Sequence, residues 1–160
     1  MTIFLHISLL VLAYVTLWFI ISLIKKRNDV ADIAWGLGFV LIATFLFFTQ
    51  PQSNISILIY TLVALWGVRL AIHIGSRSRG KEEDFRYRKW REEWGNNFLI
   101  RSYLQVYVLQ GFFMYIISLP IIIACISTEN NVNSFTYIGF ALWLITFYLK
   151  LLVIISSPFL

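Results

Sequence analysis

Charged residues are scarce in this chain of 160 residues. Only 13% of the residues are Asp, Glu, Lys or Arg, whereas 59% are hydrophobic and the mean hydropathy is +0.78. An average soluble domain has about 25% charged residues and about 45–50% apolar ones. A chain with so little charge cannot cover its surface in water, so the composition excludes an ordinary soluble domain and predicts a membrane protein.

Other absences narrow the possible functions. Cys125 is the only cysteine, so an internal disulfide and a thiolate metal cluster are both excluded. The chain has no pair of histidines at metal-ligand spacing, no P-loop and no Ser–His–Asp set. The net charge of +5 lies beside apolar segments, which favours membrane lipids as partners over nucleic acid. We therefore predict no metal site and no nucleic-acid partner.

Long hydrophobic runs make up most of the chain. They are close to the roughly 20 residues that a helix needs to cross a bilayer, and they are unbroken rather than alternating, which excludes β-barrel strands. We predict an all-α, multi-pass transmembrane helix bundle of about five spans, forming a single domain over residues 1–160. The predicted spans are about 3–24, 32–49, 55–75, 98–126 and 135–155.

The charges of the connecting segments predict the orientation. Residues 25–27 are all basic, the second connection has no charge, the third is strongly basic and the fourth contains Glu129 as its single charged residue. Basic loops are typical of the cytoplasmic side. We therefore predict an integral membrane protein with its N-terminus outside and its C-terminus in the cytoplasm.

Most of the charge lies in one stretch, residues 76–101, which contains 8 of the 13 basic and 5 of the 8 acidic residues. We call its cytoplasmic part, residues 76–97, the polar island. Tyr87, Trp90 and Trp94 are spaced i, i+3 and i+7, which predicts an interfacial amphipathic helix at about 81–94 with one aromatic face.

Two interpretations of this helix stay open. It can act only as an anchor at the membrane surface, supported by pairs at i and i+4 between Glu82 and Arg86, Arg88 and Glu92, and Lys89 and Glu93. Alternatively, its basic side chains can hold an anionic group such as a cofactor phosphate, because guanidinium groups offer a planar fork of donors. The side chains in question are Arg77, Arg79, Lys81 and Arg86.

Polar residues inside predicted spans are the next candidates, because such groups are costly in a bilayer. Arg69 can extend its side chain to the membrane surface, or it can form a buried pair with Asp32 or Asp84. Gln105 and Gln110 can bridge two helices or present a hydrogen bond to a substrate.

Small residues also recur inside the spans. Gly67, Ala71 and Gly75 occur every fourth residue, a pattern that predicts close packing against another helix. Gly36 and Gly38 match only a fragment of a dinucleotide-binding fingerprint, and no strand precedes them, so they carry no functional prediction.

Five short motifs follow one another along residues 28–147 and together are similar to a known family. They are Asn28-x-x-x-Asp32-x-x-Trp35-Gly36, Leu65-Trp66-Gly67-Val68-Arg69-Leu70, Glu83-Asp84-Phe85-Arg86-Tyr87, Leu109-Gln110-Gly111 and Ser118-Leu119-Pro120. The ordered set resembles the bacterial branch of the steroid 5-alpha-reductase-like membrane protein family.

The resemblance implies a helical membrane fold of about seven spans, located in a bacterial cytoplasmic membrane. It also implies that NADPH reduces a conjugated double bond in a lipophilic, lipid-like enone. Close relatives of that family include isoprenylcysteine-type carboxyl methyltransferases, so a methyltransferase stays open as an alternative.

The chain departs from the family pattern at its C-terminal end. There the family has a Gly-Phe-x-x-Glu segment, an Ala-Asp pair and an Arg-His-Pro-Asn-Tyr cluster that binds the cofactor. The corresponding place here reads Thr146-Phe147-Tyr148-Leu149-Lys150 and the chain ends ten residues later. We therefore expect a C-terminally truncated member that lacks part of the NADPH site. A non-catalytic membrane protein or interaction partner is the alternative.

Seven positions match family residues and form the candidate cofactor and substrate pocket. The resemblance implies that Arg69, Arg86 and Tyr87 help to hold cofactor or substrate near the cytoplasmic face, and that Gln110 faces the pocket. It identifies no catalytic acid, and the sequence indicates no oligomeric state. The seven are Asp32, Trp35, Arg69, Asp84, Arg86, Tyr87 and Gln110.

Overall fold

The computed structural model describes residues 2–127 and 134–156, and every regular element in these ranges is helical. The all-helical fold is therefore as predicted. Glu129, the single charged residue of the fourth connection, lies outside the described residues. In chain order the elements are α1 Thr2–Lys25, α2 Val30–Thr49, α3 Asn54–Ser78, α4 Phe85–Trp94, the 3₁₀ turn η1 Gly95–Asn97, α5 Phe98–Arg101, the π-helical segment η2 Ser102–Val108, α6 Leu109–Ile126 and α7 Ser134–Ser156.

Five helical stretches of the described chain are long and apolar enough to cross a membrane. Four of them begin and end within three residues of a predicted span. The other, Phe85–Ile126, contains the predicted span 98–126 as α5, η2 and α6 and also includes α4 and η1. Large hydrophobic side chains are exposed on the outside of the bundle, among them Ile24 and Phe48. In a bilayer these side chains contact lipid, so the chain is an integral membrane protein.

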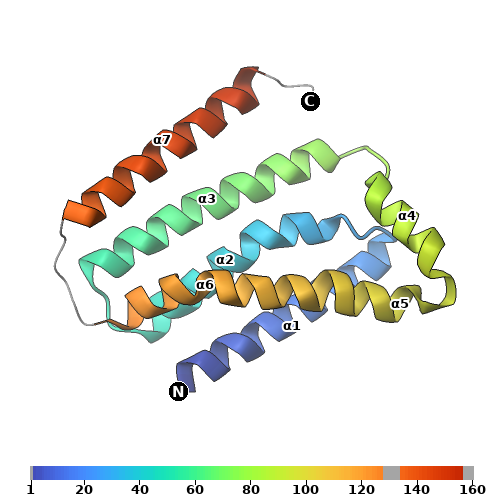
Figure 1. The fold of residues 1–160 in the computed structure, drawn as a ribbon, viewed down its shortest axis with the longest axis horizontal. Coiled ribbons are helices and arrows are strands. Elements are labelled where there is room, and N and C mark those ends of the chain that lie inside the picture. Colours follow the sequence, from blue (N-terminus) through green and yellow to red (C-terminus); the bar gives the residue numbers. More distant parts are fainter. Residues whose placement is uncertain (1, 128–133, 157–160) are drawn as a thin grey trace.

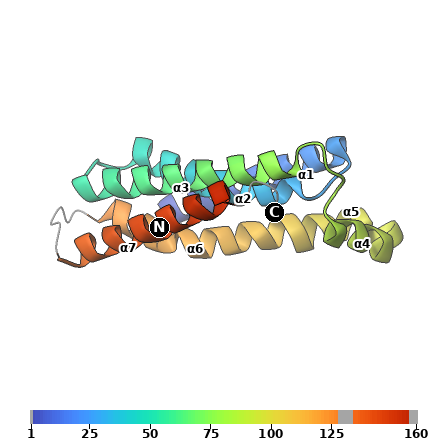
Figure 2. The same ribbon diagram turned by 90° about the horizontal axis from the view of Figure 1, so that it is seen from above.

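Helix α2 is the centre of the bundle, with α1, α3 and α6 packed against it (Figure 1). Half of its apolar span is buried, compared with none of the span in α7. Phe39, Ile42 and Leu46 are almost completely buried. Figure 2 shows α2 and α3 in one layer and α6 in the other. Interior positions therefore gather around α2, while α7 remains at the edge.

Helices α2 and α3 approach so closely that only glycine is accommodated at two facing positions. A Cβ atom added to Gly67 would lie 2.6 Å from the carbonyl oxygen of Gly36, and one added to Gly36 would lie 2.7 Å from that of Gly67. Ala71 is buried in the same contact. The predicted small-residue packing is therefore present at Gly67 and Ala71, and Gly36 has a packing role.

The fourth span is not a uniform α-helix. Its segment η2 has the wider turn of a π-helix, and Ser102, Val106 and Tyr107 all face the interior and are buried. Segments of this kind occur frequently at functional sites. This one begins directly after α5, at the end of the bundle that carries the polar island (Figure 1).

The island helix is shorter than predicted. Helix α4 begins at Phe85 rather than near residue 81, because the Asp84 side chain accepts a hydrogen bond from the Arg86 backbone N–H at 2.9 Å and caps the helix there. The helix ends at Trp94, and Gly95 follows with φ +45°, a left-handed conformation that favours glycine. Residues 81–84 therefore form a loop.

The three aromatic residues of α4 share one face, as their spacing predicts. The rings of Tyr87 and Trp90 are 5.4 Å apart, and those of Trp90 and Trp94 are 5.5 Å apart and stacked. Tyr87, however, is buried inside the protein, while Trp90 is exposed. The N-terminal end of this face therefore packs on the bundle and is not a membrane anchor.

The close contact of α2 and α3 can be tested by filling it. In Gly67→Ala the new methyl group meets backbone atoms that cannot move independently of α2, so we expect the free energy of unfolding to fall by about 1–3 kcal/mol. Unfolding of the purified protein by denaturant in detergent, followed by circular dichroism, measures it. Gly75→Ala is the control, because its Cβ would lie 3.8 Å from Ile33. Equal losses in both variants would contradict this packing.

The predicted orientation can be tested by labelling introduced cysteines. With Cys125 replaced by Ala, Arg79→Cys places a thiol in the island, and Gln52→Cys places one in the loop between α2 and α3. Both positions are exposed. A membrane-impermeant maleimide added to intact cells should label position 52 and not position 79. The reverse pattern would show that the island faces outward.

Candidate functional site

A cavity of about 870 Å³ opens at the island end of the bundle, between α2, α3 and the start of α4. We call it the island cavity. Its size is typical of small-molecule sites, which measure about 300–1,000 Å³. Apolar side chains form one part of its wall and polar side chains the rest. The lining residues are Asp29, Asp32, Trp35, Leu70, His73, Ile74, Arg77, Ser78, Lys81, Glu82, Asp84, Phe85, Arg86 and Gln110.

Asp32, in the first turn of α2, contacts two side chains of α4. The Tyr87 hydroxyl donates a hydrogen bond to Asp32 Oδ1 at 3.0 Å, and Arg86 Nη2 lies 3.6 Å from Oδ2. Arg86 also donates to both carboxylate oxygens of Asp84, at 3.1 and 3.2 Å. One guanidinium thus connects two carboxylates that are 52 residues apart in the sequence.

Asp84 lies in the loop before α4, and its carboxylate is held in the ionised form. The hydrogen bond from the Arg86 side chain lowers the pKa of Asp84 below its ordinary value, and the Arg86 backbone N–H adds to this effect. Because the folded pKa is lowered, the resulting stabilisation is present above the ordinary Asp pKa and is lost as the pH falls through the folded value. At neutral pH the cap on α4 is intact.

Gln110 and Trp35 line the island cavity from different helices. Gln110 Nε2 donates to the backbone carbonyl of Ala31 at 3.0 Å, so this amide bridges α6 and α2. Trp35 packs edge-on against Phe39, with ring centroids 5.3 Å apart. Gln105, the other amide of the fourth span, is exposed on the outside.

Arg69 lies apart from the other six candidates. Asp32, Trp35, Asp84, Arg86 and Gln110 line the island cavity, and Tyr87 bonds Asp32 beside it. Arg69 instead lines two cavities between α3 and α7, with its guanidinium 5.2 Å from the centre of the Phe147 ring. Among the described residues it forms no ion pair, so the expected alternative of a pair with Asp32 or Asp84 is not observed.

Contacts between residues 26–29 and the polar island form a loop junction that the sequence pattern does not predict. The Glu83 carboxylate, 12% exposed, accepts hydrogen bonds from the Asn28 backbone N–H at 2.5 Å and from Arg91 at 3.0 Å. Arg91 also donates to the carbonyl oxygen of Lys26 at 3.3 Å. Arg27 donates to the carbonyl oxygen of Lys81 at 3.2 Å. The two basic loops therefore lie together at one end of the bundle.

Asn28 and Asp29 complete the junction from the α2 side. The Asn28 side chain is buried and donates to the Ser102 hydroxyl at 2.8 Å, which connects it to η2. Arg27 donates to both oxygens of Asp29, and this bond raises the pKa of Arg27. The one sequence signal for these contacts is that Asn28 and Glu83 belong to the motifs shared with the reductase-like family.

Only one of the three expected i, i+4 pairs of the island is formed. Lys89 and Glu93 lie 3.7 Å apart. Glu82 pairs with Arg88 at 2.8 Å instead, because Glu82 precedes the helix and its position is set by the loop. The expected pairs of Glu82 with Arg86 and of Arg88 with Glu92 were therefore wrong.

Two cations of the island cavity have no acidic partner in the described part of the chain. Arg86 is paired with Asp84 and Asp32, whereas Arg77 and Lys81 form no ion pair through their side chains. Arg77 is close enough to Asp84 to contribute to the lowered pKa of that carboxyl. These two cations are therefore available to an anionic ligand.

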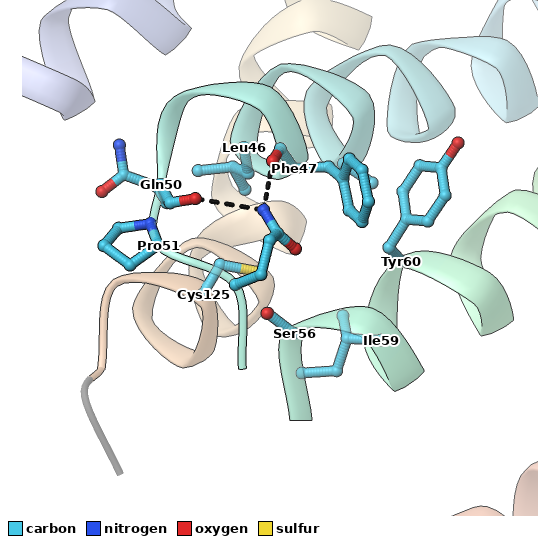
Figure 3. A pocket seen from close by; sticks show the side chains of 10 residues that line it. Leu46, Phe47, Gln50, Pro51, Ser56, Ile59, Tyr60 and Cys125 are labelled. Atoms are coloured by element: carbon cyan, nitrogen blue, oxygen red, sulfur yellow. Dashed lines mark hydrogen bonds between the residues drawn. The ribbon is translucent and has the colours of Figure 1, made fainter. Parts of the chain in front are cut away.

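A much smaller cavity lies toward the opposite end of the bundle. The cavity there, beside the loop between α2 and α3, measures about 10 Å³ (Figure 3). Gln52 lines it, and the Gln52 side-chain amide donates to the carbonyl oxygens of Phe47 and Gln50. Cys125 is buried at its edge. This cavity cannot hold a ligand larger than about one water molecule.

A comparison with protein families places this geometry in context. Residues 18–153 match the family described as protein of unknown function, DUF1295. The chain belongs to the DUF1295 family. This family is associated with steroid 5-alpha-reductase-like proteins. No curated protein and no solved structure matches the chain.

The loop junction can be tested by removing its acceptor. Glu83→Ala leaves the Arg91 guanidinium and the Asn28 N–H without their partner, so we expect the free energy of unfolding to fall by about 1–3 kcal/mol. Thermal unfolding in detergent measures the change. The control Glu93→Ala removes an exposed carboxylate from a surface pair and should change stability by less than about 0.5 kcal/mol. The same small effect for both variants would mean that the junction does not hold the island in place.

Proposed function

We propose that this protein is an NADPH-dependent reductase of a conjugated double bond in a lipid-like enone, and that its site is the island cavity in a bacterial cytoplasmic membrane. One observation carries the proposal. The cavity combines two cations without acidic partners, Arg77 and Lys81, with an apolar wall. Membership in a family associated with steroid 5-alpha-reductase-like proteins supports the reaction class.

The residues present fit the anionic part of such a cofactor. Phosphate groups require positive side chains, and guanidinium and ammonium groups both bind them. Arg77 lies in the last turn of α3, and Lys81 lies in the loop after this helix. Both line the cavity, so Arg77 and Lys81 would hold the phosphates at its polar side. Asp84, already bonded to Arg86, would not oppose the phosphates with a free carboxylate.

The apolar wall fits a lipophilic substrate. Trp35, Leu70 and Ile74 come from α2 and α3 and line the cavity. These side chains bind through burial of apolar surface and exclude water from the reacting carbons. Gln110 lies in the same wall and would orient a substrate carbonyl with its amide.

When bound, NADPH supplies the hydride that reduces the double bond, and a proton added to the neighbouring carbon completes the reduction. The chain's own contribution is a set of hydrogen-bonded polar side chains. The Tyr87 hydroxyl is held by Asp32, and Asp32 in turn lies beside Arg86. The Tyr87 hydroxyl points its hydrogen toward Asp32, and this bond holds the Asp32 carboxylate at the edge of the cavity.

Cofactor titration tests the proposal. The purified protein in detergent should bind NADPH saturably, as followed by tryptophan fluorescence or calorimetry. Arg77→Ala should weaken binding about ten-fold to a hundred-fold, because one charge-assisted hydrogen bond to a phosphate is worth about 1.5–3 kcal/mol. Arg79→Ala is the matched control, because Arg79 is exposed and does not line the cavity.

Two results would contradict the proposal. The absence of saturable NADPH binding would remove the reductase function from this chain. Saturable binding of S-adenosylmethionine in its place would assign the cavity to methyl transfer. Oxidation of NADPH in the presence of a lipophilic enone, lost in the Arg77 variant, would establish the activity directly.

A further inference from the structure

Arg69 is a charged residue inside a membrane span whose guanidinium lacks an acidic partner. Its Nε atom is buried and has no hydrogen-bond partner. The Phe147 ring is its one charge-stabilising contact within the described ranges. Cations at this depth normally pair with a carboxylate or a carbonyl group, because an uncompensated charge is costly in a bilayer. Within the described residues, therefore, no negative group balances the charge of Arg69.

Two cavities meet at Arg69 and Phe147, between α3 and α7. We call them together the α3–α7 cleft. The larger measures about 570 Å³ and is walled mainly by apolar side chains. The smaller measures about 240 Å³. The first is lined by Ala64, Leu65, Val68, Arg69, Ile72, His73, Ser76, Phe147 and Leu151, and the second by Trp66, Arg69, Trp143, Thr146, Phe147 and Lys150.

The charge of the cleft has one sign. Lys150 lines the smaller cavity together with Arg69, and no acidic residue lines either cavity. Helices α3 and α7 run in the same direction (Figures 1 and 2). Arg69 lies fifteen residues after Asn54, and Lys150 lies sixteen residues after Ser134. The two cations are therefore at similar depth, since each helical residue advances about 1.5 Å.

These cations lie near the boundary of the bilayer core on the island side. Arg69 lies nine residues before Ser78, the last residue of α3, or about 14 Å along the helix. Helix α3 has 25 residues, about five more than a bilayer core requires, so Arg69 lies close to the core boundary. Basic pockets between membrane helices are suited to lipid headgroups at this level.

We infer that the α3–α7 cleft binds an anionic phospholipid. The headgroup phosphate pairs with Arg69 and Lys150 in the smaller cavity, and an acyl chain lies along the apolar wall formed by Leu65, Val68 and Ile72. A lipid accounts for both properties of the cleft, its positive charge and its hydrophobic wall. A soluble anion accounts only for the first. This site is separate from the island cavity and does not depend on the proposed reductase activity.

Lipid titration of the full chain in detergent tests this inference. The probes are phosphatidylglycerol and phosphatidylcholine with identical short acyl chains, and inorganic phosphate alone. Binding is measured by native mass spectrometry and by the shift of the unfolding temperature. Phosphatidylglycerol should bind at least about ten-fold more tightly than phosphatidylcholine, because the positively charged cleft attracts the net negative charge that only phosphatidylglycerol carries.

Variants locate the binding site. Arg69→Gln and Lys150→Gln should each weaken phosphatidylglycerol binding about ten-fold, and Arg79→Gln, at an exposed cation of the island, should leave it unchanged. Lys150 is exposed, so Lys150→Gln keeps the test valid if Arg69→Gln fails to fold. The affinity for NADPH should not change in either cleft variant, because neither residue lines the island cavity.

Three outcomes would overturn the inference. Equal affinity for the two lipids would show that charge does not select the occupant. Equal stabilisation by inorganic phosphate would assign the cleft to a soluble anion. An unchanged affinity for phosphatidylglycerol in both cleft variants would place the lipid elsewhere on the protein.

Discussion

The carboxylate of Glu83 accepts hydrogen bonds from the Asn28 backbone and from Arg91, and these bonds join the loop after α1 to the loop before α4. The position of α4 depends on this contact, because the helix has only ten residues and would be marginal alone. Once α4 is held there, Tyr87 and Arg86 reach Asp32 and form one side of the island cavity. The contact also brings together basic loops that would otherwise repel each other.

Arginines that have a carboxylate partner differ in role from arginines that have none. Arg27, Arg86 and Arg91 each have a carboxylate partner, so they stabilise the loops. Arg69 and Arg77, both on α3, have no such partner in the described chain. The first lines the α3–α7 cleft and the second the island cavity. His73 lies between Arg69 and Arg77 in the sequence and lines both cavities. Helix α3 therefore forms a common wall between a polar cavity and a mainly apolar one.

Close packing of α2 and α3 makes this arrangement possible. The backbones meet at Gly36 and Gly67, and no side chain separates them there. This closely packed pair of helices presents Trp35 and Leu70 to the same cavity. At the other edge of the bundle α7 is mostly exposed over residues 134–152, and its Phe147 ring lies 5.2 Å from the Arg69 guanidinium of α3. This difference in packing leaves room for a ligand between α3 and α7, and none at the point where α2 and α3 meet at Gly36 and Gly67.

Several properties of this protein follow from local sequence alone. Hydrophobic length determined the five spans, since a bilayer imposes the same length on every helix that crosses it. Spacing determined the shared face of Tyr87, Trp90 and Trp94, and Gly95 determined where α4 ends. Most of the candidate site could also be anticipated, but only through a resemblance to other proteins.

Tertiary structure decided the rest, because the deciding contacts join residues that are distant in the chain. Two local contacts were missed as well, because Asp84 caps the start of α4 and Glu82 pairs with Arg88 rather than with Arg86. The Glu83 junction spans 55 residues and has no periodic signal. Arg69 shares a helix with Leu70, yet the two line different cavities, because successive residues on a helix point about 100° apart. The sequence identified Arg69 as a charged residue inside a predicted span. Only the packing of α3 against α7 showed that it lines the α3–α7 cleft.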